Sequence, residues 1–390
     1  MHIDKDTKCC DIVIGMKVLV RQFLGKPHSW SVCGWGWGRA LKQLGHEVHL
    51  FSTDGIKNIP SDLKENLIGY TEENQNQVHG RLPDKDYDAQ FSYTCMKNFQ
   101  NYLSFGTKNR FGTWCYEWAG KNVLPNGFAK NYKYCDKLCA PSKFAKRVFL
   151  ESGIPEDAII VIPHGIDVER YKKTTTISEI TSIDKFKIGC VLGQNHIRKN
   201  IPGMLEAYGK AFTNKDDVCL ILKASEKPIK QQFDVSLNAC LNAFKSKFPK
   251  HAEIKVISNF IDDMSDFYRS IDASYTMTHC ECFYLPSLES AVSGKLSIAP
   301  NWGGQLDILN KFNSLLIEGK ETRADPKSMY WESKNNAIWF LPSIDDAVEK
   351  LRYAAVNYKT MNANIEKQRN DAYEKYSWIN ITKQYMYLCK

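Results

Sequence analysis

The chain has 390 residues, which exceeds the size at which a single hydrophobic core usually stops growing, so we expect two domains. Hydrophobic residues make up 43% and charged residues 25%, proportions that are typical of a globular enzyme and argue against a disordered or fibrous protein. No apolar run reaches the length of a membrane span, and residues 1–15 lack the apolar core of a signal peptide, so we expect a soluble cytoplasmic protein.

The net charge and the spacing of the cysteines indicate which ligands and partners to expect. A net charge of +8 suits an anionic ligand, and would also suit peripheral contact with an acidic membrane surface. Lys and Arg are spread along the chain without a recognised nucleic-acid-binding module, so nucleic acid is not the expected principal partner. The 13 cysteines are scattered and lack the paired spacing of a zinc site, so we expect reduced, buried thiols and no bound metal.

The first part of the chain alternates between predicted strands and helices. Met16–Phe23 is an apolar run of strand length, a glycine-rich turn and a helical pattern follow to about Gly45, and Glu47–Ser52 is a second strand. This β-α-β order predicts a parallel sheet. The elements predicted next are strands at Ala89–Thr94, Gly112–Trp118, Tyr134–Ala140 and Ile159–Ile162, and a helix over Ser142–Glu151 with Ser142 as its N-cap.

The glycine run formed by Gly34, Gly36 and Gly38 is a candidate phosphate loop. Glycines let the backbone approach a bound anion, and a helix that follows points N–H groups at it. A dinucleotide-binding loop would read G-x-G-x-x-G with an acidic residue ending the second strand, whereas this run reads G-x-G-x-G. A nicotinamide or flavin cofactor is therefore not favoured, and a purely structural turn is a serious alternative.

The alternation restarts after Pro163–Asp167, which we interpret as the hinge between two series. The second series has strands at Lys187–Leu192, Val218–Lys223, Glu253–Ile257, Ala273–Met277 and Leu296–Ala299, with helices near 200–212, 228–247 and 261–270. We therefore expect an α/β protein with two Rossmann-like, doubly wound domains facing a central cleft. The expected divisions are an extension over 1–15, domains over 16–165 and 166–365, and a final helix over 366–390 that packs back on the first domain.

Two adjacent cations, Arg198 and Lys199, follow the first strand of the second series and precede a helix. At the carboxyl end of a strand they are placed to neutralise phosphate charge, Lys as a point charge and Arg as a fork. The alternative is that they are solvated residues at a helix entry. We favour a function for Lys199 and leave both interpretations open for Arg198.

Glu281 and Glu289 lie on either side of a predicted strand-to-helix turn, where open α/β sheets bind their ligands. An apolar strand precedes Glu281, and the helix that carries Glu289 starts at Pro286 and ends near Gly294. The spacing alone is not distinctive. The same spacing recurs at Glu65 and Glu73 and at Glu366 and Glu374.

The turn between the two carboxylates suits an anion together with a polyol. Backbone amides around Phe283–Leu285 and the start of the next helix form a cradle for an anion, and the carboxylates can accept hydrogen bonds from sugar hydroxyls. An acid/base pair of glycosidase type is the rival interpretation. We do not favour it, because the site also carries phosphate-binding features, and a nucleoside diphosphate departs readily once its charge is neutralised.

With these residues the chain resembles the retaining glycosyltransferases of family 4, which have the GT-B architecture and a Glu-x7-Glu motif. The resemblance covers most of the chain from Met16 onward. It is carried by Glu281–Glu289, the segment 193–200, Pro141–Lys143, Pro163–Asp167 and Trp302–Gly304.

The resemblance implies a role for each matching residue. Glu281 would lie by the transferred sugar, Glu289 would hold the nucleotide ribose, and Lys199 would contact the diphosphate. The remaining donor-binding residues would be Arg198, Asn195, Phe283, Tyr284, Leu285, Gly303 and Gly304. The donor would be a UDP- or GDP-sugar, with no tightly bound cofactor and no metal. The acceptor hydroxyl would attack from the face that the nucleotide leaves, with retention of configuration.

The acceptor, a saccharide or glycoconjugate, is expected against the first domain. The candidate residues there are His28, Trp30, Trp35, Trp37, Tyr116, Glu117 and Trp118. Aromatic faces suit sugar stacking, although core packing is the commoner fate of tryptophan. We favour Glu117, as a catalytic residue, with one or two of the tryptophans. For His164 and His279 a structural role is at least as well supported.

The sequence departs from the family pattern in two places that bear on activity. Gln194 stands where many relatives have an arginine that contacts the diphosphate, and Cys282–Tyr284 stands where a Gly-Phe-Gly turn is usual. A nucleotide-sugar epimerase or hydrolase, and a non-catalytic protein that binds sugar nucleotides or glycans, therefore stay as alternatives. Transfer of a sugar to DNA bases is a further one that the basic charge permits.

Overall fold

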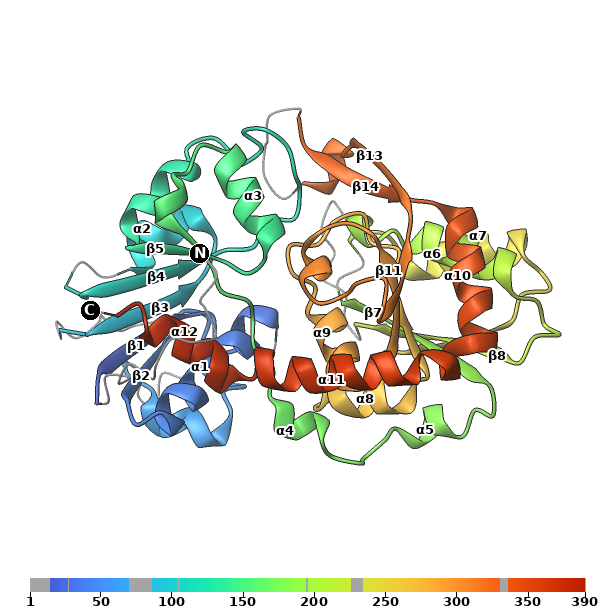
Figure 1. The fold of residues 1–390 in the computed structure, drawn as a ribbon, viewed down its shortest axis with the longest axis horizontal. Coiled ribbons are helices and arrows are strands. Elements are labelled where there is room, and N and C mark those ends of the chain that lie inside the picture. Colours follow the sequence, from blue (N-terminus) through green and yellow to red (C-terminus); the bar gives the residue numbers. More distant parts are fainter. Residues whose placement is uncertain are drawn as a thin grey trace.

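The computed structural model describes residues 15–26, 28–69, 86–103, 106–193, 196–225, 234–329 and 336–389. The predicted extension before residue 15, Gln194 and the predicted donor-binding residue Asn195 lie outside these ranges. The described chain forms two parallel six-stranded sheets with helices around them, one built from each part of the sequence (Figure 1). We call the first sheet with its helices the first half, and the second sheet with its helices the second half.

The first sheet has the strand order β2-β1-β3-β4-β5-β6, and every pair in it is parallel. Its strands are β1 (Lys17–Gln22), β2 (Glu47–Ser52), β3 (Ala89–Tyr93), β4 (Asn109–Thr113), β5 (Lys137–Ala140) and β6 (Ile159–Val161). The order reverses beside β1 and β3. Helices α1 (Ser29–Gln43), α2 (Phe99–Tyr102) and α3 (Lys143–Glu151) connect these strands.

The second sheet has the order β12-β11-β10-β7-β8-β9 and is also parallel throughout. Its strands are β7 (Phe186–Gly193), β8 (Val218–Ala224), β9 (Glu253–Ile257), β10 (Ala273–Tyr275), β11 (Leu296–Pro300) and β12 (Ser314–Ile317). Its helices are α6 (Ile201–Ala211), α7 (Leu237–Lys247), α8 (Met264–Ser270), α9 (Leu285–Val292) and α10 (Ile344–Asn357). The order reverses between β7 and β10, which is where an open sheet of this kind binds ligands.

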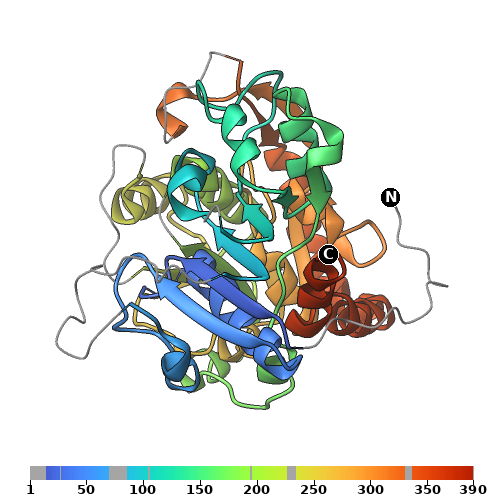
Figure 2. The same ribbon diagram turned by 90° about the vertical axis from the view of Figure 1, so that its left-hand side faces the viewer.

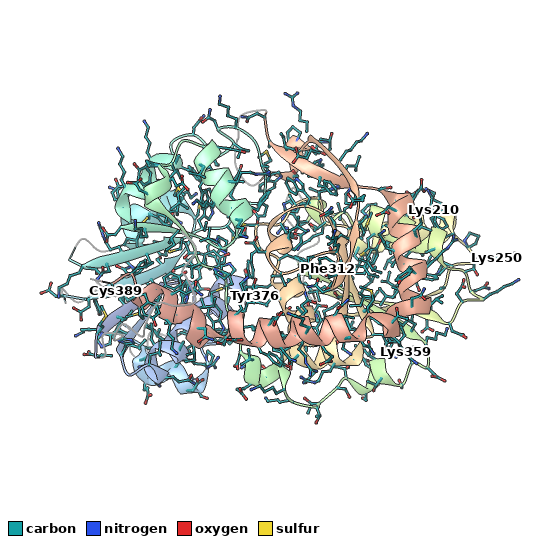
Figure 3. All side chains as sticks on the ribbon, in the orientation of Figure 1. Lys210, Lys250, Phe312, Lys359, Tyr376 and Cys389 are labelled. Carbon is teal, nitrogen blue, oxygen red and sulfur yellow. The ribbon has the colours of Figure 1, made fainter. Side chains whose placement is uncertain are left out.

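The C-terminal part of the chain returns from the second half to the first. Helix α11 (Asn362–Tyr376) crosses between the halves, and α12 (Trp378–Met386) packs against α1 (Figure 1). Lys359 lies on the side of the second sheet, Tyr376 between the halves and Cys389 on the side of the first sheet (Figure 3). From the side of the first sheet, the C-terminal helices run along its flank (Figure 2).

Aromatic packing fixes α12 on the first half. Tyr385 is 1% exposed, and its ring lies 4.7 Å from that of Phe91 and 5.4 Å from that of Phe111. At the crossing itself, the amide of Ile166 donates to the carbonyl of Tyr376 at 2.8 Å. In the chain this contact is followed by α4 (Val168–Tyr171) and α5 (Ser178–Thr181), and α4 lies beside α11, where the Tyr373 hydroxyl donates to the Tyr171 carbonyl at 3.4 Å.

A two-stranded antiparallel hairpin is among the elements that the sequence analysis did not predict. It consists of β13 (Gly319–Arg323) and β14 (Ile338–Pro342) and belongs to the second half, yet it reaches the first. Ala119 and Ile338 exchange backbone hydrogen bonds of 3.0 and 2.8 Å. The indole of Trp118 donates to the Ser328 hydroxyl at 3.2 Å. The hairpin is therefore a second bridge between the halves, at the end opposite to α11 in Figure 1.

Two predicted elements are corrected by the structure. The strand expected at Gly112–Trp118 is instead β4, which ends at Thr113. Its apparent continuation came from the alternating aromatic residues Trp114, Tyr116 and Trp118, which are all buried in a core cluster and do not extend the strand. The glycine-rich turn expected after the first strand is also wrong, because all three glycines of the run lie inside α1.

Candidate active site

The candidate site lies at the carboxyl ends of β7 and β10, on the two sides of the point where the second sheet reverses its order. A short 3-10 helix, Ile197–Lys199, follows β7, and Asn200 after it has a positive φ of 52°. The Asn200 side chain accepts from the Gly203 amide at 3.2 Å and donates to the Met277 carbonyl at 3.0 Å. This asparagine therefore caps α6 and ties the cation loop to the strand that leads to Glu281.

Glu281 is the centre of a buried charge cluster. Its Oε1 lies 2.6 Å from Lys199 Nζ and 2.6 Å from Arg198 Nη1, and it accepts a hydrogen bond from the Thr278 hydroxyl at 3.1 Å. Burial alone would raise the pKa of Glu281, but the two cations outweigh it and hold the pKa below its ordinary value. Glu281 is therefore ionised, and the structure brings together the three residues that the sequence analysis placed at the phosphates and the sugar.

Glu117 joins this cluster from the first half. Its Oε1 lies 3.7 Å from Nη2 of Arg198, so the guanidinium stands between the carboxylates of Glu117 and Glu281. Burial raises the pKa of Glu117 to about 7, although Arg198 opposes the rise. The ordinary solvated interpretation of Arg198 is thus wrong, since its side chain is 11% exposed and paired with both carboxylates.

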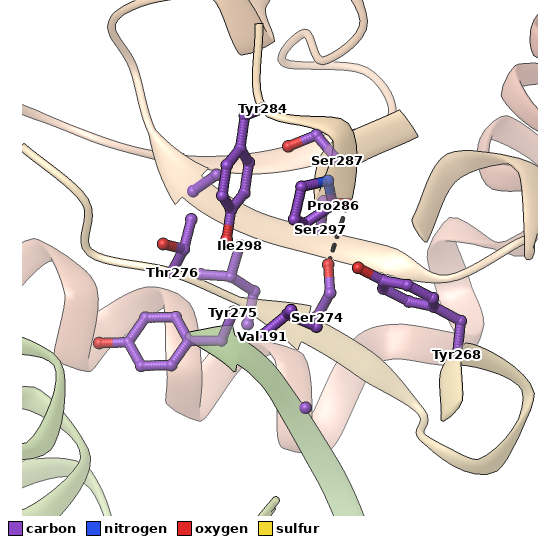
Figure 4. A pocket seen from close by; sticks show the side chains of 12 residues that line it. Val191, Tyr268, Ser274, Tyr275, Thr276, Tyr284, Pro286, Ser287, Ser297 and Ile298 are labelled. Atoms are coloured by element: carbon purple, nitrogen blue, oxygen red, sulfur yellow. Dashed lines mark hydrogen bonds between the residues drawn. The ribbon is translucent and has the colours of Figure 1, made fainter. Parts of the chain in front are cut away.

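Tyr284 shapes the floor beside Lys199. Lys199 Nζ lies 5.0 Å from the centroid of the Tyr284 ring, within the range of a cation–π contact. Tyr284 has a left-handed backbone with φ of 66°, which is unusual for a bulky residue and is a frequent mark of functional sites. Its ring fills the space at the strand ends with Tyr268 and Thr276, leaving a cavity of ≈ 10 Å³ (Figure 4).

Glu289 has a different environment from Glu281. It lies on α9, and its Oε2 accepts a hydrogen bond from the Tyr268 hydroxyl at 2.9 Å; Tyr171 is a second hydroxyl partner. Burial raises the pKa of Glu289 to about 7, against the effect of these two hydrogen bonds. The two carboxylates of the motif therefore differ in charge state near neutral pH, because Glu281 is held by cations and Glu289 by hydroxyl groups.

The backbone of the turn between the carboxylates is fixed from both halves. The Ser142 hydroxyl donates to the Cys282 carbonyl at 2.6 Å, and the Gly304 amide donates to the Glu281 carbonyl at 2.8 Å. A Cβ on Gly304 would overlap the Cys282 carbonyl, and Gly303 has a φ of 91°, so both positions need glycine. Sequence analysis placed Gly303 and Gly304 at the donor; the structure shows them supporting the turn that carries Glu281.

The glycine run needs a functional correction as well as a structural one. Gly34, Gly36 and Gly38 are helical residues whose missing side chains make room for neighbours: a Cβ on Gly36 would overlap the Trp378 ring, and one on Gly34 would overlap Leu24 and Gln22. These contacts are with the protein's own core. The run therefore packs α1 closely and is not a phosphate loop.

The predicted acceptor residues are divided by burial. Trp37 and Tyr116 are each 1% exposed, Trp37 against Tyr385 and Tyr116 through a hydrogen bond to the Val123 carbonyl at 3.1 Å, so their assignment to the acceptor is corrected. Trp35 is half-buried and donates to the Leu24 carbonyl at 3.1 Å. His28, also half-buried, is the N-cap of α1.

A row of rings that the sequence analysis did not recognise leads from the turn into the first half. Phe283 lies 4.9 Å from His164, and His164 stacks on Tyr93 at 5.0 Å. Tyr93 lies 5.2 Å from Trp30, which stacks on Phe23 at 5.4 Å. Phe23 and Trp30 are half-buried. Phe23 ends the first apolar run, and only the fold shows that its ring faces Trp30.

Within the described ranges, no group of three or more His, Cys, Asp or Glu side chains is arranged to hold a metal ion. Nor does that part of the chain contain a helix long and apolar enough to cross a membrane. His279 is 8% exposed and stacks on Trp339 at 4.2 Å, with its Nδ1 2.8 Å from the Phe340 carbonyl. His279 therefore has a structural role, because it fixes strand β14 of the hairpin.

Comparison with known proteins shows the fold. No protein-family model matches the chain, and a search of curated proteins found no match. Anabaena HepE in complex with UDP-glucose is similar in structure, with a TM-score of 0.65 and 13% identity over 96% of this chain and 99% of that one. Sucrose-phosphate synthase from Thermosynechococcus elongatus has a TM-score of 0.68 and 12% identity over 95% and 98% of the two chains. A glycosyltransferase from Rickettsia africae has a TM-score of 0.67 and 16% identity over 96% and 98%. The chain has the GT-B fold of these glycosyltransferases along its length.

Proposed function

We propose that the protein is a retaining glycosyltransferase that moves a sugar from a nucleotide-diphosphate sugar, with UDP or GDP as the nucleotide, to a hydroxyl group of a saccharide or glycoconjugate. The observation that carries the proposal is the pair of buried cations on Glu281 at the switch point of the second sheet. Structural neighbours support the donor class, since HepE was solved with UDP-glucose and a plant starch synthase with ADP and acarbose.

The charge cluster supports the way in which the donor would bind. Lys199 and Arg198 share the single carboxylate of Glu281, and Glu117, with its raised pKa, neutralises Arg198 only in part at neutral pH. An entering diphosphate can therefore take over both cations at little electrostatic cost. The helix α9, which begins at Leu285, adds the positive end of its dipole on the same side. Glu281, released from the cations, can then accept hydrogen bonds from the sugar hydroxyls.

The chemical step that we propose uses charge neutralisation. The bond from the anomeric carbon to the diphosphate oxygen breaks, the acceptor oxygen bonds to the same face of that carbon, and the acceptor proton passes to the diphosphate. Lys199 and Arg198 stabilise the departing diphosphate, which is where negative charge develops. Glu289 would hold the ribose, exchanging its present partners Tyr268 and Tyr171 for the ribose hydroxyls.

For the acceptor we propose the side of the first half that carries Glu117, Trp30 and Phe23. The carboxyl of Glu117 is within reach of the Arg198–Glu281 cluster, and the half-buried rings of Trp30 and Phe23 offer a stacking surface. Glu117 would orient the acceptor hydroxyl. The DNA-base alternative has no structural observation in its favour.

The test is a donor panel. The protein is incubated with UDP- and GDP-sugars and a panel of saccharide acceptors, with chelator present, and nucleotide release and product are followed. We expect Lys199→Ala and Glu281→Gln each to reduce turnover by at least about a hundredfold, in the range measured for the removal of a transition-state partner. The surface pair Lys146 and Glu156, 2.8 Å apart, supplies the matched controls Lys146→Ala and Glu156→Gln, which should keep full turnover. Full activity of Glu281→Gln would contradict the site assignment.

A non-catalytic sugar-nucleotide-binding protein is the second candidate, and Tyr284 is the observation in its favour. Its ring occupies space at the carboxyl ends of the strands, at a position where the family usually has glycine, and it makes a cation–π contact with Lys199. Calorimetry with the same donors separates the two proposals, because a binding protein would give heat without nucleotide release. Release of free sugar or of an epimer without any acceptor would indicate a hydrolase or an epimerase.

A further inference from the structure

A cluster of sulfur and aromatic groups lies beside the candidate active site and has no role in the proposed reaction. Its centre is Cys115, which follows β4 in the first half. The Tyr93 hydroxyl donates to Cys115 Sγ at 2.8 Å, and Nε2 of His164 lies 3.5 Å from the same sulfur. The thiol of Cys282, from the turn in the second half, is a third hydrogen-bond partner.

These contacts stabilise negative charge on one sulfur. Three donors converge on Cys115 from three different segments of the chain, and one of them is an imidazole that can carry a full positive charge. Burial alone would raise the pKa of Cys115, but the hydrogen bonds from Cys282, His164 and Tyr93 lower it well below its ordinary value. His164 shows the reciprocal effect: burial lowers its pKa, and Cys33 and Cys115 raise it above the ordinary value. These contacts favour a thiolate on Cys115 and a charged imidazole on His164.

Accessibility distinguishes Cys115 from the other thiols of the cluster. Cys115 is half-buried, whereas Cys33 and Cys282 are buried. The Cys282 sulfur also lies at the backbone amide of Tyr116, the residue next to Cys115, and the Cys282 carbonyl is held from the first half by Ser142. A reactive sulfur and a second thiol are thus held together by a turn that is fixed in place.

We infer that Cys115 is a modification site: a hydroperoxide oxidises its sulfur, and Cys282 then forms a disulfide with it that joins the two halves. In the first step Cys115 Sγ attacks one peroxide oxygen and the O–O bond breaks. The departing oxygen takes its proton from His164, which leaves a sulfenic acid and water, or an alcohol from an organic hydroperoxide. In the second step the Cys282 sulfur attacks, the S–S bond forms, and the sulfenic oxygen leaves as water with the thiol proton.

The consequence for the enzyme follows from the position of Cys282 between Glu281 and Phe283. A disulfide there would fix the turn of the donor site to the first half and oppose any movement of Glu281 away from Lys199. The expected loss of transfer activity rests on the proposed function, whereas the formation of the disulfide does not. Mass measurements therefore test the disulfide, and activity measurements test the proposed function, independently of each other.

The first experiment treats the whole chain with hydrogen peroxide and follows intact mass and a non-reducing digest. We expect the loss of two hydrogen atoms and one linked peptide pair that contains Cys115 and Cys282, both reversed by dithiothreitol. The Cys115→Ser variant should form no linked pair. Cys115→Ala replaces it if Cys115→Ser folds poorly, with the same expected result. Cys282→Ser should accumulate a sulfenic acid on Cys115 that dimedone captures. Oxidation that begins at other cysteines, or no linked pair in the folded protein, would overturn the inference.

The matched control is Cys135→Ser, in the same half of the molecule. Cys135 is buried, and burial raises its pKa to about 12, so it should neither react nor affect the reaction at Cys115. Wild type and Cys135→Ser should therefore form the linked pair at the same rate. A slower reaction in Cys135→Ser would contradict the special position of Cys115.

The second experiment measures the role of His164 by alkylation with iodoacetamide between pH 6 and 8. The titratable groups around Cys115 are Tyr93, His164, Cys33, Cys282 and, on its own segment, Glu117. With His164 in place the rate at Cys115 should change less than about twofold over this range, because the thiolate is already formed. In His164→Gln the rate should rise by close to tenfold per pH unit, as for N-acetylcysteine in the same buffers. A steep profile in the wild type would refute the thiolate.

Discussion

At the scale of single residues, the two carboxylates of the motif differ in the free energy that their ionisation costs the folded protein. Glu289 is half-buried and is held by hydroxyl groups, and removal from water raises its pKa to about 7. The folded protein therefore binds this proton more tightly than the unfolded chain does. Its contribution to stability is present below the ordinary glutamate pKa and is lost as the pH rises through about 7.

We predict that Glu289→Gln stabilises the protein at pH 8 relative to pH 5. A glutamine keeps an oxygen for the Tyr268 hydroxyl and needs no proton, so the gain in unfolding free energy should approach roughly 3 kcal/mol at pH 8 and fall to about 1 kcal/mol or less at pH 5. Urea unfolding at the two pH values measures it. Glu156→Gln is the control, because Glu156 is exposed and paired with Lys146, which lowers its pKa. An equal effect of Glu289→Gln at both pH values would show that Glu289 is not buried in its charged form.

The sequence predicted which charged residues of the site meet better than it predicted which of the neighbouring side chains are buried. Lys199, Arg198 and Glu281 could be placed together because each lies in a loop that follows a strand of one parallel sheet, and the carboxyl ends of such strands meet at one edge. Burial could not be predicted in the same way. Trp37 and Tyr116 are aromatic residues of the kind that stack on sugars, yet both side chains lie in the hydrophobic core. Cys115 and His164 belong to segments far apart in sequence, and nothing local to either indicates that they meet.

At the scale of elements, α1 shows why the glycine run was misread as a loop. Three glycines within one helix lower its intrinsic stability, so the pattern favours a turn when taken alone. Tertiary packing reverses that preference, because α12 lies so close that Gly36 contacts the Trp378 ring. The strands, by contrast, could be predicted to within a few residues, since buried parallel strands are short apolar runs between polar turns. The hairpin β13–β14 could not, because β13 (GKETR) contains no apolar residue and so lacks the pattern of a strand.

Two neighbouring glycines of α1 give a matched test of this packing. Gly36→Ala places a methyl group into the Trp378 ring and should destabilise the protein by about 1–3 kcal/mol, as overpacked cores do. At Gly38 the same methyl group meets only the side chains of Leu50 and Leu63, at 3.4 Å, so helix propensity should dominate. Gly38→Ala should therefore be neutral or stabilising by up to about 1 kcal/mol.

Thermal and urea unfolding compare the two variants directly. Trp378→Leu, which removes the ring, should abolish the difference between glycine and alanine at position 36 when the two changes are combined. If Gly36→Ala proved as mild as Gly38→Ala in the wild-type background, the close approach of α12 to α1 would be wrong.

At the scale of the whole molecule, the two halves are joined at both ends, by the α11–α12 return and by the hairpin. The hairpin bridge contains a backbone contact, between Ile338 and Ala119, that one substitution can weaken. The backbone N–H of Ile338 donates to the Ala119 carbonyl, and the Ile338 carbonyl accepts from the Ala119 N–H. A proline at position 338 therefore removes one donor to the first half and leaves the pairing of this position with Arg323 in place. We predict that Ile338→Pro costs about 1–2 kcal/mol and raises amide exchange at Ala119.

Ile338→Val is the control for this experiment, because it keeps the backbone donor and most of the side chain. It should leave amide exchange at Ala119 unchanged. Hydrogen exchange followed by mass spectrometry reads the two variants side by side. Protection of Ala119 that survives in Ile338→Pro would mean that the segment is held by other contacts, such as the hydrogen bond between Trp118 and Ser328.

The return of α12 to the first half also sets the order in which the protein can mature on the ribosome. Strand β1 is synthesised long before α12, yet the core cluster that contains its Val18 and Val20 also contains Trp378, Ile381 and Tyr385. N-terminal domains usually fold during synthesis. Here the core of the first half lacks part of its apolar side chains until α12 has been made, so we expect this half to complete its folding only after the second half has been synthesised.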